Sequence, residues 1–236
     1  MKAILEKATQ RGHSHIDWMD AYYSFSYGEY NNPNRMKFGA LRFLNDFTIA
    51  IDKSIRIKNA QNIILVTLPL KGSLHHSDSY GHEDMVRWGQ AQIMNTGTGT
   101  VTSEYTNKSE HHLVEFIQIG IIPKKMDTAP AHEIIDFSGS LKEHSFVTII
   151  APHGPAAGKI DQQASISLGE FHHGDSVEYK CHTPGNGVFV LLLGGSMELS
   201  GYQMDTKDSI EITDFDKLEF SFSKNSTVLL IEVPMQ

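Results

Sequence analysis

The sequence has one cysteine, no basic run and no long hydrophobic run. Because Cys181 is the only thiol, no disulfide can form within the chain, which fits a reducing compartment. The formal net charge of −8 at pH 7 argues against a surface that binds nucleic acid through its phosphates. No stretch approaches the length of a membrane span, and the first residues lack the apolar segment of a signal peptide. We therefore expect a cytoplasmic protein with neither a membrane nor a nucleic acid as direct partner.

What the 236 residues do contain is a series of short strand patterns separated by glycine turns. Residues 61–70 form a nearly continuous run of β-branched residues and leucine, as expected of a buried strand. Shorter strand patterns follow at 74–79, 85–88, 92–95 and 101–105. Short strands at regular intervals, separated by turns that contain glycine, are typical of a β-barrel or a β-sandwich. The sequence therefore predicts an all-β fold.

The strand patterns fall into two halves, which are similar in their arrangement of strands and turns but not in their residues. Leu113–Ile122 reads as the last strong strand of the first half, and a polar stretch follows it. Strand patterns resume at Phe146 and continue almost to the end of the chain. We therefore predict two β domains in tandem, at residues 1–130 and 131–236.

The stretch Gln92–Tyr105 reads as two strands joined by a tight turn. Gly97 and Gly99 supply the turn, because glycine adopts turn conformations without steric cost. Alternate residues of a strand face the same side, so Thr102 and Glu104 point together. Their spacing suits two side chains that share one ligand.

Several blocks of the first half occur in a recognisable order. They are Phe25–Tyr27, Met36–Arg42, Asn45–Asp46, His76–Gly81 and Gly89–Met94. The signature that follows them is matched by Gln92, Met94, Gly97, Gly99, Ser103 and Glu104. In these blocks, and more loosely in its second half, the chain resembles the pirin family of two-domain cupins. The resemblance implies a bicupin, with two β-barrel domains of the jelly-roll type.

Pirins hold one metal ion, usually iron, through a histidine-x-histidine pair and a histidine-x-glutamate pair. Two such pairs on neighbouring strands present four donors to one point, and imidazole with carboxylate suits Fe(II). The resemblance places the first pair at Lys58 and Ala60 and the second at Thr102 and Glu104. An ammonium group cannot bind a cation, alanine has no donor atom, and a threonine hydroxyl is a poor neutral ligand. We therefore expect no metal at this position and predict no cofactor.

The other histidines do not supply the missing donors. Three pairs are adjacent in the sequence: His75 with His76, His111 with His112, and His172 with His173. Adjacent strand residues point to opposite faces, so neither member of a pair can chelate together with the other. In the family, the block that contains His76 is a hairpin outside the metal shell. His13 and His15 have the required spacing of two, but they precede the expected barrel and lack a partner pair.

Two classes of function follow. The one we expect is a pirin-like protein without the metal, which presents a cavity in its N-terminal barrel to a small molecule or a surface to a protein partner, in a regulatory role. We expect such a protein to be a monomer. The alternative is the quercetin 2,3-dioxygenase activity that the resemblance implies, in which iron or another divalent metal opens a flavonol ring with dioxygen. The candidate pocket residues are Arg56, Lys58, Ala60, Thr102, Glu104 and His112.

The spacing of two also predicts which of these residues meet. Arg56, Lys58 and Ala60 share one strand face, which we expect to be the cavity side. A carboxylate inside a barrel is costly unless it is paired or protonated. We therefore expect an ion pair between Lys58 and Glu104, with Arg56 at the mouth of the pocket. The alternative is that the Lys58 ammonium group extends to solvent and that Glu104 is hydrated by water.

Overall fold

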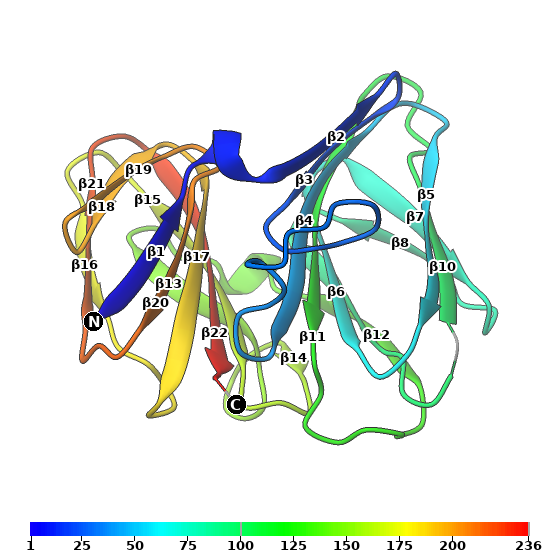
Figure 1. The fold of residues 1–236 in the computed structure, drawn as a ribbon. Helices are drawn as coiled ribbons and strands as arrows, with labels where there is room; N and C mark the ends of the chain where they lie inside the picture. The colour runs from blue at the N-terminus through cyan, green and yellow to red at the C-terminus, as the bar shows by residue number, and fades with distance from the viewer. Residues whose placement is uncertain (100, 236) are drawn as a thin grey trace. The chain divides into compact units, whose positions relative to one another are not determined.

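The computed structural model describes residues 1–99 and 101–235. Nearly all of the regular structure is β-strand, which confirms the all-β prediction (Figure 1). The helices of the described residues are two single 3-10 turns, η1 (Ala8–Gln10) and η2 (Ser138–Ser140). None of the described helices is long and apolar enough to cross a membrane. The chain divides into two compact units. Each unit is a pair of sheets of the cupin jelly-roll type rather than a closed barrel.

The N-terminal unit comprises Gly12–Lys37 and Leu41–Gly139. Its seven-stranded sheet has the order β12-β9-β6-β11-β4-β3-β2. These strands are β2 (Gly12–Ile16), β3 (Met19–Tyr23), β4 (Leu41–Ile49), β6 (Ile64–Lys71), β9 (Gln90–Asn95), β11 (Val114–Ile121) and β12 (Ala131–Asp136). Its four-stranded sheet has the order β5-β10-β7-β8. These strands are β5 (Ser54–Ala60), β7 (Ser73–Asp78), β8 (Glu83–Arg87) and β10 (Val101–Thr106).

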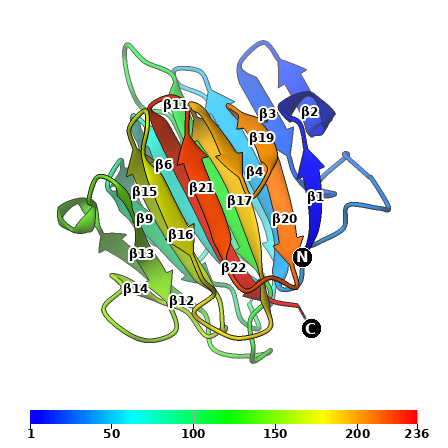
Figure 2. The same ribbon diagram turned by 90° about the vertical axis from the view of Figure 1, so that its left-hand side faces the viewer.

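The C-terminal unit comprises Met1–Arg11, Phe38–Ala40 and the chain from Ser140 onward (Figure 2). Its seven-stranded sheet has the order β1-β20-β17-β22-β15-β13-β14. These strands are β1 (Lys2–Glu6), β13 (Ser145–Ala151), β14 (Gly158–Lys159), β15 (Ser165–Phe171), β17 (Asn186–Gly194), β20 (Ser209–Thr213) and β22 (Ser226–Pro234). The four-stranded sheet has the order β16-β21-β18-β19. These strands are β16 (Ser176–Tyr179), β18 (Ser196–Leu199), β19 (Tyr202–Asp205) and β21 (Leu218–Phe222).

The two units do not divide at residue 130, where the sequence predicts the boundary. Strand β1 comes from the N-terminal end of the chain but pairs with β20, so it belongs to the C-terminal unit (Figures 1 and 2). Strand β12 lies beyond residue 130 but pairs with β9, so it extends the sheet of the N-terminal unit. The physical reason is that hydrogen bonds between strands distant in sequence, rather than a polar linker, define each sheet.

Large apolar side chains fill the space between the two sheets of the N-terminal unit. Strand β10 shows the expected alternation, because Ser103 and Tyr105 are buried whereas Thr102 and Glu104 are partly exposed. The buried face contributes to a core that also contains Phe43, Phe47, Leu65, Met94 and Phe116. The inner face of β10 therefore belongs to the packed apolar core of this unit.

A carboxylate, Glu232 of β22, lies at the centre of a polar network in the C-terminal unit and is 1% exposed. The hydroxyl of Tyr179 donates to it at 2.8 Å, and the side-chain amide of Asn186 donates at 2.9 Å. The backbone N–H groups of His182 and Thr183 donate at 2.8 and 2.9 Å. The His182 imidazole lies 3.1 Å away. Both carboxylate oxygens are therefore satisfied within the fold.

Candidate functional site

The four positions that correspond to the pirin metal ligands lie on β5 and β10, which pair antiparallel. Glu104 is opposite Arg56, but the register shifts between Val101 and Ser103, so that Val101 is opposite Ala60. Between those points two residues of β5 face one residue of β10. This is the geometry of a β-bulge, which re-aims side chains on the strand that carries it.

The bulge and the core together decide which side chains of β5 face outward. Ile55 and Ile57 are each 9% exposed and belong to the apolar core, whereas Arg56 and Lys58 are exposed. Ala60, beyond the bulge, packs against the core again. The prediction that Arg56, Lys58 and Ala60 share one face that points into the cavity is therefore wrong. Two isoleucines occupy the inner face, and the bulge breaks the period of two.

Glu104 has partners other than the one expected. Its carboxylate accepts a hydrogen bond from Ser54 Oγ at 2.6 Å and pairs with Arg56 Nη2 at 3.1 Å. The hydroxyl of Ser54, followed by the Arg56 guanidinium, holds the pKa of Glu104 below its ordinary value. The described residues show no Lys58–Glu104 ion pair, so that prediction is also wrong. Arg56 lies directly across the ladder from Glu104 and reaches it first.

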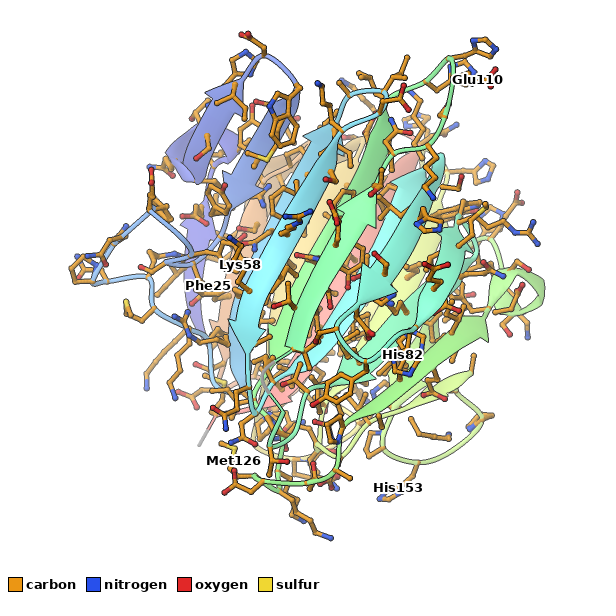
Figure 3. The ribbon with its side chains drawn as sticks, turned by 90° about the vertical axis from the view of Figure 1, so that its right-hand side faces the viewer. Phe25, Lys58, His82, Glu110, Met126 and His153 are labelled. Carbon is orange, nitrogen blue, oxygen red and sulfur yellow. The ribbon has the colours of Figure 1, made fainter. Side chains whose placement is uncertain are left out.

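Lys58, which Figure 3 labels, lines two hollows. The first, here called the Glu104 hollow, has a volume of about 340 Å³. It is lined by Arg56, Lys58, Ser77, Asp78, Ser79, Thr102 and Glu104. The second, here called the Lys58 hollow, has a volume of about 480 Å³. It is lined by Ser26, Tyr27, Gly28, Arg42, Phe43, Arg56, Ile57, Lys58, Ala60, Gln61, Ile63 and Leu65.

The structure thus brings most of the predicted site residues together. Lys58, Thr102 and Glu104 share the Glu104 hollow, and Lys58 and Ala60 share the Lys58 hollow. His112 lines neither hollow. It lies in the loop after β10, where its backbone accepts a hydrogen bond from Asn107 and donates one to Ser109. This loop holds His112 at an exposed position, away from the other candidates.

The side chains at the four family positions do not fit the iron that the family implies. Glu104 offers a carboxylate, but Ser54 and Arg56 already engage both of its oxygens. Lys58 brings a positive charge to the same hollow, Thr102 offers only a neutral hydroxyl, and Ala60 has no donor atom. Fe(II) sites in proteins instead use imidazole and carboxylate donors with open positions.

Sequence reasoning missed the wall of the Lys58 hollow that Tyr27 and Phe43 provide. Their rings pack 4.9 Å apart, and burial raises the pKa of Tyr27 to about 12, so its phenol stays neutral. Tyr27 belongs to a loop before β4, and nothing in its local pattern shows that this loop folds over β5. The density of aromatic residues between 18 and 30 was the available signal, since such a segment must cover a core.

Comparison with known proteins gives the relationship of the whole chain. The family model described as Pirin matches residues 5–121, and the model described as Quercetinase C-terminal cupin domain matches residues 148–233. The quercetin 2,3-dioxygenase of Escherichia coli strain K12 is 28% identical over 234 residues, which cover 98% of each chain. A pirin-like protein of Caulobacter vibrioides is 24% identical, with 91% of this chain and 92% of the relative covered.

A solved structure supports the same relationship. The bacterial pirin YhhW of E. coli, determined in complex with nickel(II), is 26% identical. It superimposes with a TM-score of 0.89, and all of both chains is covered. The order of the two cupins, the matched sequence blocks and these comparisons agree, and the chain belongs to the pirin family, among relatives of the quercetin dioxygenases.

Proposed function

We propose that this pirin has lost the family metal site and works as a binding protein, with the Lys58 hollow as the site for a small anionic molecule with an apolar body. The observation that carries the proposal is the charge of the lining. Arg42, Arg56 and Lys58 all reach the hollow, and its lining contains no carboxylate. A concentration of positive charge in a chain of net charge −8 attracts anions to that place.

The three cations of the hollow differ in how they are held. Arg42 donates to the backbone oxygens of Ser26 and Met36, and Arg56 is paired with Glu104. Within the described part of the chain, Lys58 has neither a hydrogen bond nor an ion pair. Its ammonium group is therefore the one that can meet a ligand anion without first breaking a contact.

The rest of the lining supports an apolar ligand body. Tyr27 and Phe43 form one wall, and Ile57, Ile63 and Leu65 contribute aliphatic surface. Ligand sites in proteins combine such surface with a few polar groups that fix orientation. A concave site of this size favours a small molecule over a protein surface as the partner.

The test measures binding of aromatic carboxylates, such as benzoate and salicylate, by isothermal titration calorimetry with EDTA present. Lys58→Met should weaken binding about tenfold, which corresponds to ~1.4 kcal/mol, because it removes the unpaired charge. Lys53→Met is the matched control, since Lys53 is exposed in the turn before β5 and lines neither hollow. Equal affinities of the two variants, or no binding by the unmodified protein, would contradict the proposal.

The alternative function is the quercetin 2,3-dioxygenase activity named for the E. coli relative. It predicts uptake of dioxygen with quercetin when Fe²⁺, Ni²⁺ or Mn²⁺ is added, and loss of that uptake in Glu104→Gln. The binding function predicts no uptake above that of the metal alone, together with carboxylate binding that EDTA does not change. The two readouts separate the functions in one preparation of protein.

A further inference from the structure

A second group of metal-ligating side chains lies elsewhere in the N-terminal unit. His76 of β7, Asp84 of β8 and His132 of β12 each offer one donor atom, and these atoms lie within 4.8 Å of one another. Asp84 Oδ2 is 3.2 Å from His132 Nε2 and 3.9 Å from His76 Nδ1. The group is distinct from the family position, because none of the three lines the hollows beside Lys58.

The fold, rather than the sequence spacing, assembles this group. His76 and Asp84 are direct partners across the β7–β8 hairpin of the four-stranded sheet. His132 comes from β12, which pairs with β9 at the edge of the other sheet of the same unit. The imidazole of His82, just before β8, stacks on that of His132 with centroids 4.4 Å apart. The edges of both sheets therefore meet at these imidazoles, and Figure 3 shows His82 at a place well apart from Lys58.

His76 is the observation that points to a missing ligand. Its side chain is fully buried, yet neither ring nitrogen has a hydrogen-bond partner. A buried polar group without a partner destabilises a fold, and native proteins seldom leave one unsatisfied unless a water, an ion or a ligand completes it. Nδ1 faces the Asp84 carboxylate from beyond hydrogen-bond distance, which leaves room for an atom between them.

The distances suit a metal ion. Metal–nitrogen and metal–oxygen bonds of about 2.0–2.2 Å place neighbouring ligand atoms about 3.3–3.6 Å apart in a tetrahedral site. The distance from Asp84 Oδ2 to His132 Nε2 lies just below that range, and the distance from Asp84 Oδ2 to His76 Nδ1 exceeds it by a few tenths of an ångström. Two imidazoles and a carboxylate are donors that suit zinc, nickel and iron. We infer that His76, Asp84 and His132 form a binding site for a divalent transition metal.

The surroundings supply the outer contacts that such a site needs. The Gln92 amide lies 3.0 Å from His132 Nε2, and its other end accepts a hydrogen bond from Tyr105 Oη at 2.7 Å. A metal at His132 Nε2 replaces the contact with the Gln92 nitrogen. Because a hydroxyl both donates and accepts, the Gln92 amide can reverse against Tyr105 and turn its oxygen toward the ion as a fourth donor. The Asp84 side chain is 30% exposed, which leaves a path to solvent.

Zinc is the probe for the test. Isothermal titration calorimetry of the full chain with Zn²⁺ should show one site whose affinity falls at least about 100-fold in Asp84→Asn and in His132→Gln, more than the ~10–100-fold typical of losing an outer contact. Asp20→Asn and His144→Gln are the controls. They disrupt two other groups of potential ligands, His13-His15-Asp20 and Glu143-His144-His172, which are largely exposed. The controls should leave the affinity unchanged.

A second measurement does not depend on how the variants fold. Crystals of the unmodified protein soaked in Zn²⁺ should give an anomalous peak between His76, Asp84 and His132. The inference is overturned if Zn²⁺ does not bind, if binding survives Asp84→Asn, or if the peak lies on one of the exposed groups. Lys58→Met should leave Zn²⁺ binding unchanged, so the metal site and the anion site in the Lys58 hollow are tested independently of each other. The dioxygen-uptake assay with added metal should accordingly also be run with Asp84→Asn, in which only the family position can hold the metal.

Discussion

Each unit of this pirin buries ionisable side chains, and two of these, Glu232 in the C-terminal unit and His76 in the N-terminal unit, have opposite surroundings. In the C-terminal unit, Glu232 is 1% exposed and accepts hydrogen bonds from four residues. In the N-terminal unit, His76 is fully buried and accepts none. The fold supplies hydrogen-bond donors to both oxygens of the Glu232 carboxylate and leaves the His76 imidazole without a hydrogen-bond partner.

The electrostatic outcome follows from this difference. Burial by itself raises the pKa of Glu232, but the donors around it, His182 above all, outweigh burial and hold that pKa below its ordinary value. Burial lowers the pKa of His76 to about 4, so its imidazole is neutral at pH 7. A buried charge that the protein itself completes is structural. A buried neutral base that nothing completes is available to a ligand.

The largest expected effect is a loss of stability when one of these two buried side chains is mutated. Glu232→Ala removes the acceptor shared by Tyr179, Asn186 and two backbone amides, and should lower the free energy of unfolding by about 3–5 kcal/mol. His76→Phe removes nitrogens that have no partner, so in EDTA it should change the free energy by less than about 1 kcal/mol. Urea unfolding followed by circular dichroism gives both values. A large loss in His76→Phe would show that the fold already satisfies this imidazole.

A smaller effect should appear as a dependence on pH. Because the pKa of Glu232 is lowered by folding, its contribution is fully present above about 4.5, its ordinary value, and is lost as the pH falls through the lowered pKa. The pKa of His182 is raised by the same carboxylate, so that contribution is present below about 6.5 and is lost as the pH rises through the raised value. The stability difference between the unmodified protein and Glu232→Gln should therefore be largest between about pH 4.5 and 6.5. Glu29→Gln, on the surface, should show a small difference with no such maximum.

The smallest expected effect concerns the family metal position. The Arg56 and Glu104 side chains are 59% and 29% exposed, and exposed ion pairs contribute about 0–1 kcal/mol. A double-mutant cycle with Arg56→Met and Glu104→Gln should give a coupling free energy in that range. The cycle with Lys58→Met in place of Arg56→Met should give none, because Glu104 is paired across the ladder instead. A stronger coupling of Glu104 to Lys58 than to Arg56 would instead support the ion pair that the strand spacing predicts.

Much of the fold could be predicted because local pattern determines it. The apolar run 61–70 becomes β6, and the alternation of β10 places Tyr105 in the core and Glu104 outside it. The sequence blocks around Gln92 identify the family. The domain boundary could not be predicted, because β1 and β12 are assigned by partners distant in sequence.

The candidate sites show where local pattern stops being sufficient. The period of two fails at the bulge opposite Thr102, and with it the predicted inward face of β5. Adjacent histidines on one strand cannot chelate the same ion, and this rule holds for His75 and His76. The rule does not exclude that His76 shares an ion with residues of other strands. His132 lies at the start of the predicted second domain, and only the pairing of β12 with β9 brings it to His76.

Strand β1 comes from the start of the chain but pairs within the C-terminal unit, and this also bears on how the chain folds during synthesis. The partner of β1, β20, follows it by about 200 residues, which take roughly 10–40 s to synthesise at typical rates. Throughout that interval the segment has no strand to pair with, and an unpaired strand is a template for association with other chains. Lys2, Glu6 and Lys7 place charges at both ends of the segment, and charges of this kind oppose such association until the ribosome has delivered the partner.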